Sequence, residues 1–178
     1  MHPLVWLIGG AVAFYLAFES KQANANVNPN PEPAKVKTGG DWQLPAKGAP
    51  YADAIKAAET SYGLPDRLLA RVLYQESRFR DDIIDGETLS PAGAIGIAQF
   101  MPATAEELGV DPLDVNQAID GAGRYLQSLY GQFGNWPEAI GAYNAGPGNI
   151  RKRGIAGSKP ETQTYVAEIT HDVFGTYA

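Results

Sequence analysis

The chain of 178 residues is long enough for one domain of ordinary size and an appendage. It is 44% hydrophobic and 19% charged, so it can bury a core, and its net charge of −6 argues against a nucleic-acid partner. A nucleic-acid binder needs a positive surface to neutralise phosphates. The absence of cysteine excludes disulfides, thiolate nucleophiles and thiolate metal sites.

Residues 1–20 are predicted to form an apolar helix, because Pro3 to Phe18 carry no formal charge and are almost wholly apolar. A bilayer core needs roughly 20 helical residues, and the polar residues 19–21 can extend the run by snorkelling. We interpret the helix as a membrane anchor. The alternative is a secretory signal peptide cleaved near Ala23–Ala25, although no positively charged segment precedes the run. Lysines follow the run and none precedes it, an orientation that a virus-encoded protein tolerates better than a cell-envelope enzyme.

Residues 21–48 are predicted to be a disordered linker. The segment is rich in Asn and Pro, so it cannot bury enough apolar surface to offset the entropy of ordering, and its prolines keep it extended. Its role would be to space a domain of residues 49–178 away from a membrane surface.

The domain is predicted to be mainly α-helical, since apolar residues recur at helical spacing and no segment alternates with period two for long enough to indicate a sheet. The predicted helices span residues 51–61, 65–77, 104–108, 114–130, 136–143 and 161–174. Thr104 is expected to cap the third of these helices, and Pro147 can start a further one.

Glu76 is the candidate catalytic acid. It lies three residues after Leu73 and four after Val72, so it shares their inward helix face. Burial disfavours the charged carboxylate and raises its pKa, and a carboxylic acid that keeps its proton near neutral pH can protonate a glycosidic oxygen. A salt bridge with a neighbouring arginine such as Arg71 is the purely structural alternative.

The glycine-rich run 90–102 supplies two candidate substrate contacts on a short extended turn. Gln99 can both donate and accept hydrogen bonds, which suits acetamido groups and hydroxyls, and Met101 offers a soft surface for a sugar ring. Glycines in this run let the backbone approach a ligand closely.

Two later segments add polar groups. Tyr143 is predicted at a helix end, where its hydroxyl can hold and tune Glu76, and Asn144 beside it can bind an amide. Glu161 opens the last predicted helix, where it either complements the helix dipole or faces a cleft.

The chain resembles the lytic transglycosylase domain of the soluble lytic transglycosylase type, glycoside hydrolase family 23. The resemblance is carried, in this order, by Glu76-Ser77 and the segments 93–102, 142–146 and 161–166. The resemblance runs from about Tyr51 to the C-terminus. It implies a helical, lysozyme-like catalytic domain. It also implies cleavage of the β-1,4 bond between N-acetylmuramic acid and N-acetylglucosamine in peptidoglycan, with a 1,6-anhydro product.

Carried onto this chain, the resemblance implies that Glu76 acts as acid and then as base, with no metal and no cofactor. The substrate's acetamido group and 6-hydroxyl would replace a second carboxylate and water. Ile97-Ala98 and Phe100 depart from the family's usual Leu-Met and Ile without removing a polar group. The implied substrate-binding residues are Ser77, Ser90, Gln99, Met101, Tyr143, Asn144 and Glu161.

Two other functions stay open, a hydrolytic muramidase and a non-catalytic glycan-binding module. The acidic loop 81–87 is interpreted as solvated, because Ile83 and Ala92 break the calcium-loop pattern. The expected partners are peptidoglycan strands and a membrane contacted through the N-terminal helix, with no nucleic acid. The expected location is a membrane facing the cell envelope, on the periplasmic side or in a virion, with a virion or secretion machine as the larger assembly.

Overall fold

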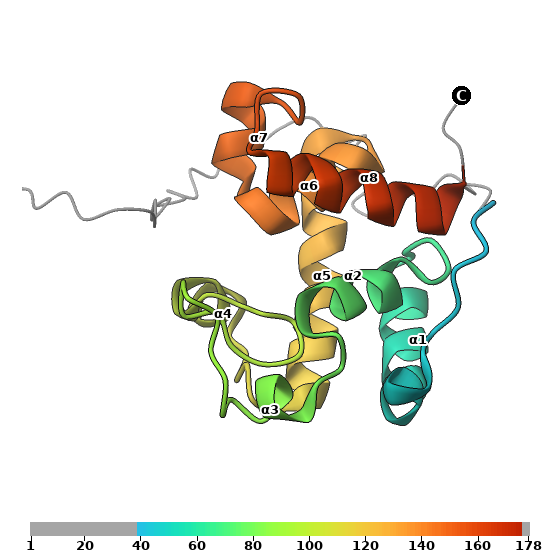
Figure 1. Ribbon diagram of the computed structural model, residues 1–178, viewed down its shortest axis with the longest axis vertical. Helices are drawn as coiled ribbons and strands as arrows, with labels where there is room; N and C mark the ends of the chain where they lie inside the picture. The colour runs from blue at the N-terminus through green and yellow to red at the C-terminus, as the bar shows by residue number, and fades with distance from the viewer. Residues whose placement is uncertain (1–38, 176–178) are drawn as a thin grey trace, which may run out of the picture. The chain divides into compact units, whose positions relative to one another are not determined.

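The computed structural model describes residues 39–175, which belong to one compact unit. These residues contain no strand, and Ile95 and Phe100 form an isolated antiparallel bridge. The mainly helical prediction is confirmed (Figure 1). The elements are η1 (Ala46–Tyr51), α1 (Ala52–Ser61), α2 (Leu68–Ser77), α3 (Asp81–Ile84), α4 (Pro102–Leu108), α5 (Val115–Phe133), α6 (Trp136–Ala145), α7 (Pro147–Arg153) and α8 (Pro160–Phe174).

The predicted apolar helix 1–20 and the linker up to residue 38 lie outside the described residues. Within residues 39–175, no helix combines the length and the apolar character needed to cross a bilayer.

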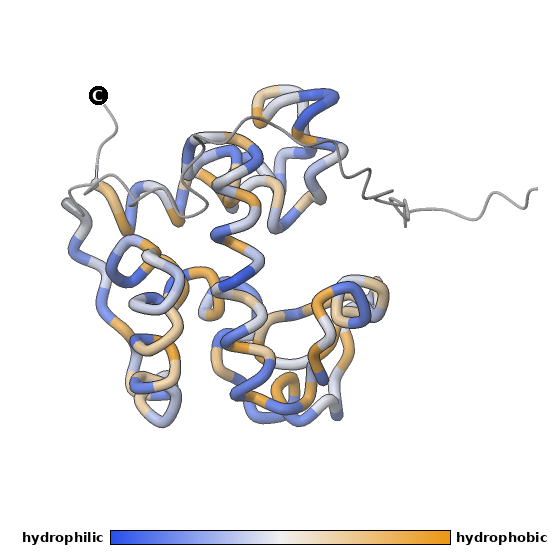
Figure 2. The backbone as a smooth tube through the Cα atoms, turned by 180° about the vertical axis from the view of Figure 1, so that it is seen from behind, coloured by the Kyte–Doolittle hydropathy of each residue, from blue (hydrophilic) through white to orange (hydrophobic). Residues whose placement is uncertain are grey.

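The long helix α5 is central to the packing: it contacts α1, α2 and α6 (Figure 1). Asp114 caps it, because the Asp114 carboxylate accepts hydrogen bonds from the next two free amides, those of residues 116 and 117. Its inward face buries Ala118, Ala122 and Leu126 completely. Hydrophobic and hydrophilic residues are interspersed along the helices, as expected for helices that bury one face and expose the other (Figure 2).

The C-terminal helices α6, α7 and α8 pack together, and α8 also contacts α2 (Figure 1). The contact between α2 and α8 brings the helix that carries Glu76 against the last helix of the domain. Elements far apart in the chain therefore meet at the candidate site.

Most predicted helices lie within three residues of the observed ones, but three details were wrong. Helix α2 begins at Leu68 instead of Pro65, because Arg67 adopts the left-handed conformation (φ 67°). Helix α4 begins at Pro102, so Thr104 lies inside the helix and is not its cap. Helix α3 and the turn η1 were not predicted.

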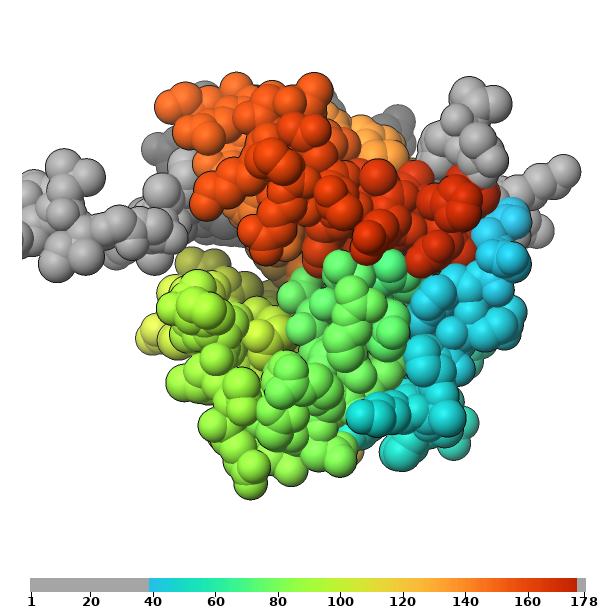
Figure 3. Space-filling model, in the orientation of Figure 1, coloured from blue at the N-terminus to red at the C-terminus, as the bar shows by residue number. Residues whose placement is uncertain are grey.

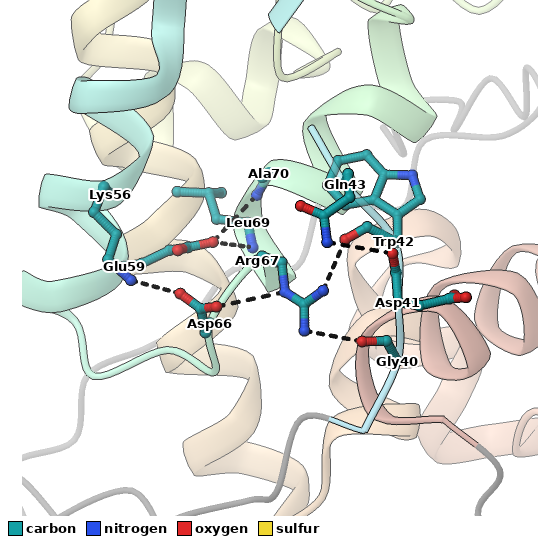
Figure 4. A network of polar contacts seen from close by, with 10 residues as sticks. All are labelled: Gly40, Asp41, Trp42, Gln43, Lys56, Glu59, Asp66, Arg67, Leu69 and Ala70. Carbon is teal, nitrogen blue, oxygen red and sulfur yellow. Dashed lines mark hydrogen bonds and ion pairs between the residues drawn. The ribbon is translucent and has the colours of Figure 1, made fainter. Parts of the chain in front are cut away.

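Residues 39–48, placed in the linker from the sequence, pack on the domain. Trp42 and Leu44 supply apolar surface that contacts the core. We call residues 39–45 the strap. Two hydrogen bonds from the Arg67 guanidinium to the carbonyl oxygens of Gly40 and Trp42 fix the strap (Figure 4).

Candidate active site

Glu76 lies in the last turn of α2, directly before a sharp change of chain direction. Arg78 (φ 52°) and Phe79 (φ 49°) both adopt the left-handed conformation, which is unusual for residues other than glycine. The turn places the Phe79 side chain in the core, where it is 1% exposed. Glu76 itself, which precedes this turn, is partly buried.

Ser77 stabilises this turn. Its hydroxyl donates to the carbonyl oxygen of Leu73 (3.1 Å) and accepts from the amide of Phe79 (3.2 Å). Ser77 is 0% exposed, so it presents no surface to a substrate. The predicted substrate contact of Ser77 is thus replaced by a structural role, because the turn needs an acceptor for the Phe79 amide.

The Glu76 carboxyl meets a tyrosine of α8. The Tyr165 hydroxyl donates to Glu76 Oε1 at 2.6 Å. Burial raises the pKa of Glu76 to about 7; the Tyr165 hydrogen bond opposes this shift, and the negative charge of Glu161 adds to it. A carboxyl with this pKa keeps its proton in a substantial fraction of molecules near neutral pH, as a group that begins the reaction by giving a proton requires.

The salt-bridge alternative for Glu76 is not realised within residues 39–175. Arg71 pairs with Asp172 and Glu168 of α8, and Arg80 pairs with Asp82. The Glu76 carboxyl therefore has a neutral hydroxyl as its hydrogen-bond donor in the described part of the chain.

Tyr143, not Tyr165, was expected to hold Glu76. The Tyr143 hydroxyl instead donates to the carbonyl oxygen of Ala98 (3.0 Å), and its ring lies 5.5 Å from the ring of Tyr125. Burial and the charge of Glu76 raise the pKa of Tyr143 well above its ordinary value. The sequence did contain a signal for Tyr165. It lies four residues after the candidate site residue Glu161, so both side chains lie on one face of α8.

The glycine-rich run forms a tight turn and not the extended one that was predicted. Ile95 and Phe100 exchange two backbone hydrogen bonds (3.0 and 3.1 Å). Between them, Gln99 adopts the left-handed conformation (φ 49°), and its side-chain amide donates to the Gly96 carbonyl oxygen (2.9 Å). A Cβ at Gly96 would lie 1.9 Å from the carbonyl oxygen of Pro112, so only glycine fits there.

The other predicted site residues lie on the glycine-rich loop, at the start of α4, at the end of α6 and at the start of α8. Ser90 accepts a hydrogen bond from the Ala94 amide (2.9 Å), and Met101 is partly buried at the start of α4. Asn144 accepts from the Thr162 hydroxyl (2.8 Å), which joins α6 to α8. Glu161 is exposed in the first turn of α8, where its charge acts on Glu76.

A hollow in the surface separates the C-terminal helices from the loop and helix α4 (Figure 3). In the same view, the green surface of α2 borders the red surface of α8. Among residues 39–175 there is no group of three or more acidic, histidine or cysteine side chains that could hold a metal ion.

The fold is that of lytic transglycosylase domains of known structure. The 70 kDa soluble lytic transglycosylase SLT70 from Escherichia coli is 29% identical and superposes with a TM-score of 0.56 over 67% of this chain and 22% of that chain. A protein-family comparison matches residues 53–166 to the transglycosylase SLT domain. The chain belongs to this family, which confirms the resemblance inferred from the sequence.

Curated relatives point in the same direction. Membrane-bound lytic murein transglycosylase F 1 of Alkalilimnicola ehrlichii is 36% identical over 109 residues, which are 57% of this chain and 21% of that protein. The transglycosylase of Enterobacteria phage PRD1 is 37% identical over 95 residues, which are 53% of this chain and 34% of that protein. The chain thus matches about a fifth to a third of the length of these relatives.

Proposed function

We propose that this domain is a lytic transglycosylase that cleaves peptidoglycan between N-acetylmuramic acid and N-acetylglucosamine. The observation that carries the proposal is the Glu76 carboxyl, with a pKa of about 7 and the Tyr165 hydroxyl 2.6 Å away. Family membership and the names of the relatives, lytic murein transglycosylases and a phage transglycosylase, support the same reaction.

In the first step Glu76 gives its proton to the glycosidic oxygen, and the bond from that oxygen to the anomeric carbon breaks. The acetamido group of the muramic acid supports the positive charge that develops on this carbon. The Tyr165 hydroxyl stabilises the carboxylate that remains, since a hydrogen bond to the charged form favours that form.

In the second step the Glu76 carboxylate takes the proton of the sugar's 6-hydroxyl, whose oxygen bonds to the anomeric carbon. The product is a 1,6-anhydro end, the proton is returned to Glu76, and no water is consumed. One protein carboxylate serves both steps, unlike ordinary retaining glycosidases, which use two carboxyl groups roughly 5 Å apart.

Six residues are proposed to bind the glycan around Glu76. Gln99 presents its side-chain oxygen and Asn144 its side-chain nitrogen, since the other half of each amide is already hydrogen-bonded, and Met101 presents an apolar surface. Burial raises the pKa of Glu76, and the charge of the exposed Glu161 adds to this shift. Ser90 and Tyr143 have hydroxyls already bonded to the backbone amide of Ala94 and the carbonyl oxygen of Ala98, so they are proposed mainly to shape the groove.

Digestion of purified peptidoglycan followed by mass analysis tests the reaction. Anhydro-muramic ends are expected from the parent chain and none from Glu76→Gln. Reducing muramic ends would instead indicate a hydrolytic muramidase, and binding without fragments would indicate a glycan-binding module.

We also propose that residues 1–20 attach the domain to a membrane, with residues 21–38 as the spacer. The names of the bacterial relatives, which are membrane-bound enzymes, and of the phage relative support an envelope or virion location. Membrane fractionation of the full chain and of a chain without residues 1–20, combined with protease accessibility, tests both attachment and orientation. A full chain found free of membranes would refute the anchor.

A further inference from the structure

Helices α2 and α8 are bonded to each other at two separate places. One is the hydrogen bond between Tyr165 and Glu76. The other is an ion pair in which Arg71 Nε donates to Asp172 Oδ2 at 2.7 Å. The two places are about 7.5 Å apart along α2, from the helical rise of about 1.5 Å per residue. Two separated polar contacts restrict the rotation of one packed helix relative to the other more than a single contact would.

The Arg71 guanidinium is enclosed. Arg71 is 3% exposed, its Nη1 donates to the Gln75 side chain (2.8 Å), and the rings of Trp42 and Tyr74 lie 5.9 and 5.7 Å from its Cζ. Aromatic faces attract a cation, and the exclusion of water strengthens its ion pair with Asp172. Trp42, which belongs to the strap, is therefore part of the environment that holds this pair.

The strap also makes hydrogen bonds with α8 and with Arg67, the residue directly before α2. The Gly40 amide donates to the carbonyl oxygen of Val173 on α8 (3.3 Å). Arg67, which immediately precedes α2, donates to the carbonyl oxygens of Trp42 (2.8 Å) and Gly40 (3.0 Å), as Figure 4 shows. A Cβ at Gly40 would lie 1.9 Å from the carbonyl oxygen of Asp172, so the strap reaches α8 only with glycine at this position.

We propose that the strap and Arg71 form a positioning device that holds α2 against α8 so that the Tyr165 hydroxyl meets the Glu76 carboxyl. Trp42, Gly40 and Arg71 are positioning residues and do not touch the substrate. The inference rests on the proposed function, since it concerns the acid of that reaction. It also means that the segment leading out of the linker contributes to catalysis besides spacing the domain.

Gly40→Ala and Trp42→Ala test the device, with Gly131→Ala as the matched control. Gly131 is exposed on α5 and an added Cβ there meets nothing within 4 Å. On a soluble peptidoglycan fragment, well below the unfolding temperature, both test variants are expected to lose about 10- to 100-fold in kcat with little change in KM. Gly131→Ala is expected to match the parent, and Trp42→Phe, which keeps a ring over Arg71, to recover part of the loss.

A double-mutant cycle separates positioning from a general loss of stability. If Trp42 acts through the Tyr165–Glu76 contact, Trp42→Ala costs much less kcat in a Tyr165→Phe background than in the parent. Ile119→Val, a destabilising change in the buried face of α5, should leave kcat unchanged in both backgrounds. If Trp42→Ala lowers kcat equally in both, the positioning device is refuted.

The two proposals fail in different ways. Activity in Glu76→Gln would overturn the proposed function itself. An inactive Glu76→Gln together with parental kcat in Trp42→Ala would overturn only the positioning device. Circular dichroism shows whether Gly40→Ala folds. If it does not, Trp42→Ala alone tests the positioning device, because it removes a partly buried ring and adds no atom that collides with the backbone of α8.

Discussion

Glu76→Gln should make the domain more stable above neutral pH while abolishing activity. Glutamine keeps the shape of the side chain but cannot ionise. In the folded parent, burial raises the pKa of the Glu76 carboxyl from 4.5 to about 7, so the folded state binds this proton more tightly than the unfolded state. The stability linked to this proton is fully present below pH 4.5 and is lost as the pH rises through about 7.

The size of this stability change follows from the pKa shift of Glu76. At about 1.4 kcal/mol per pKa unit, a change from 4.5 to about 7 corresponds to roughly 3 kcal/mol, most of it lost between pH 5 and pH 8. The free energy of unfolding of Glu76→Gln minus that of the parent should therefore grow by about 2 to 3 kcal/mol over this range.

Urea unfolding of both proteins at several pH values between 5 and 8 measures this difference. Glu106→Gln is the matched control, because Glu106 is exposed on α4 and the same substitution there should leave the pH dependence of the parent unchanged. If the stability curves of Glu76→Gln and the parent run parallel across the range, the carboxyl does not hold a raised pKa and the argument for its role as an acid fails.

Tyr165→Phe removes the hydrogen bond that lowers the pKa of Glu76, so kcat should fall and the alkaline limb of the pH–rate profile should move above about pH 7. An unmoved limb would contradict this. Ser77→Ala should lower the free energy of unfolding by about 1 to 3 kcal/mol, because a buried backbone amide loses its acceptor, with KM unchanged. A raised KM would instead support the substrate contact of Ser77 that was expected from the sequence. Gly96→Ala should destabilise far more than Gly93→Ala in thermal melts, since both have positive φ but only the first Cβ would collide with backbone, at 1.9 Å. Equal melting temperatures would refute the steric argument.

The mainly helical fold class and the position of the candidate acid could both be predicted from the amino-acid pattern. Apolar spacing places Glu76 on the inward face of its helix, where burial raises the pKa of a carboxyl. Asp114 likewise marks the start of α5 through a local hydrogen bond. These features depend on neighbours within a few residues, so the pattern of the chain is enough to predict them.

The choice between the two tyrosines could not be predicted from the sequence. Tyr143 and Tyr165 both follow Glu76 at long sequence separation, and the packing of α2 against α8 brings Tyr165 to the carboxyl. The tertiary structure also gave Gln99 a left-handed backbone, a conformation that non-glycine residues adopt only when surrounding contacts offset its cost. The strap is a third case. Its composition is that of a linker, and its order comes from the distant groups Arg67 and α8, which no local pattern contains.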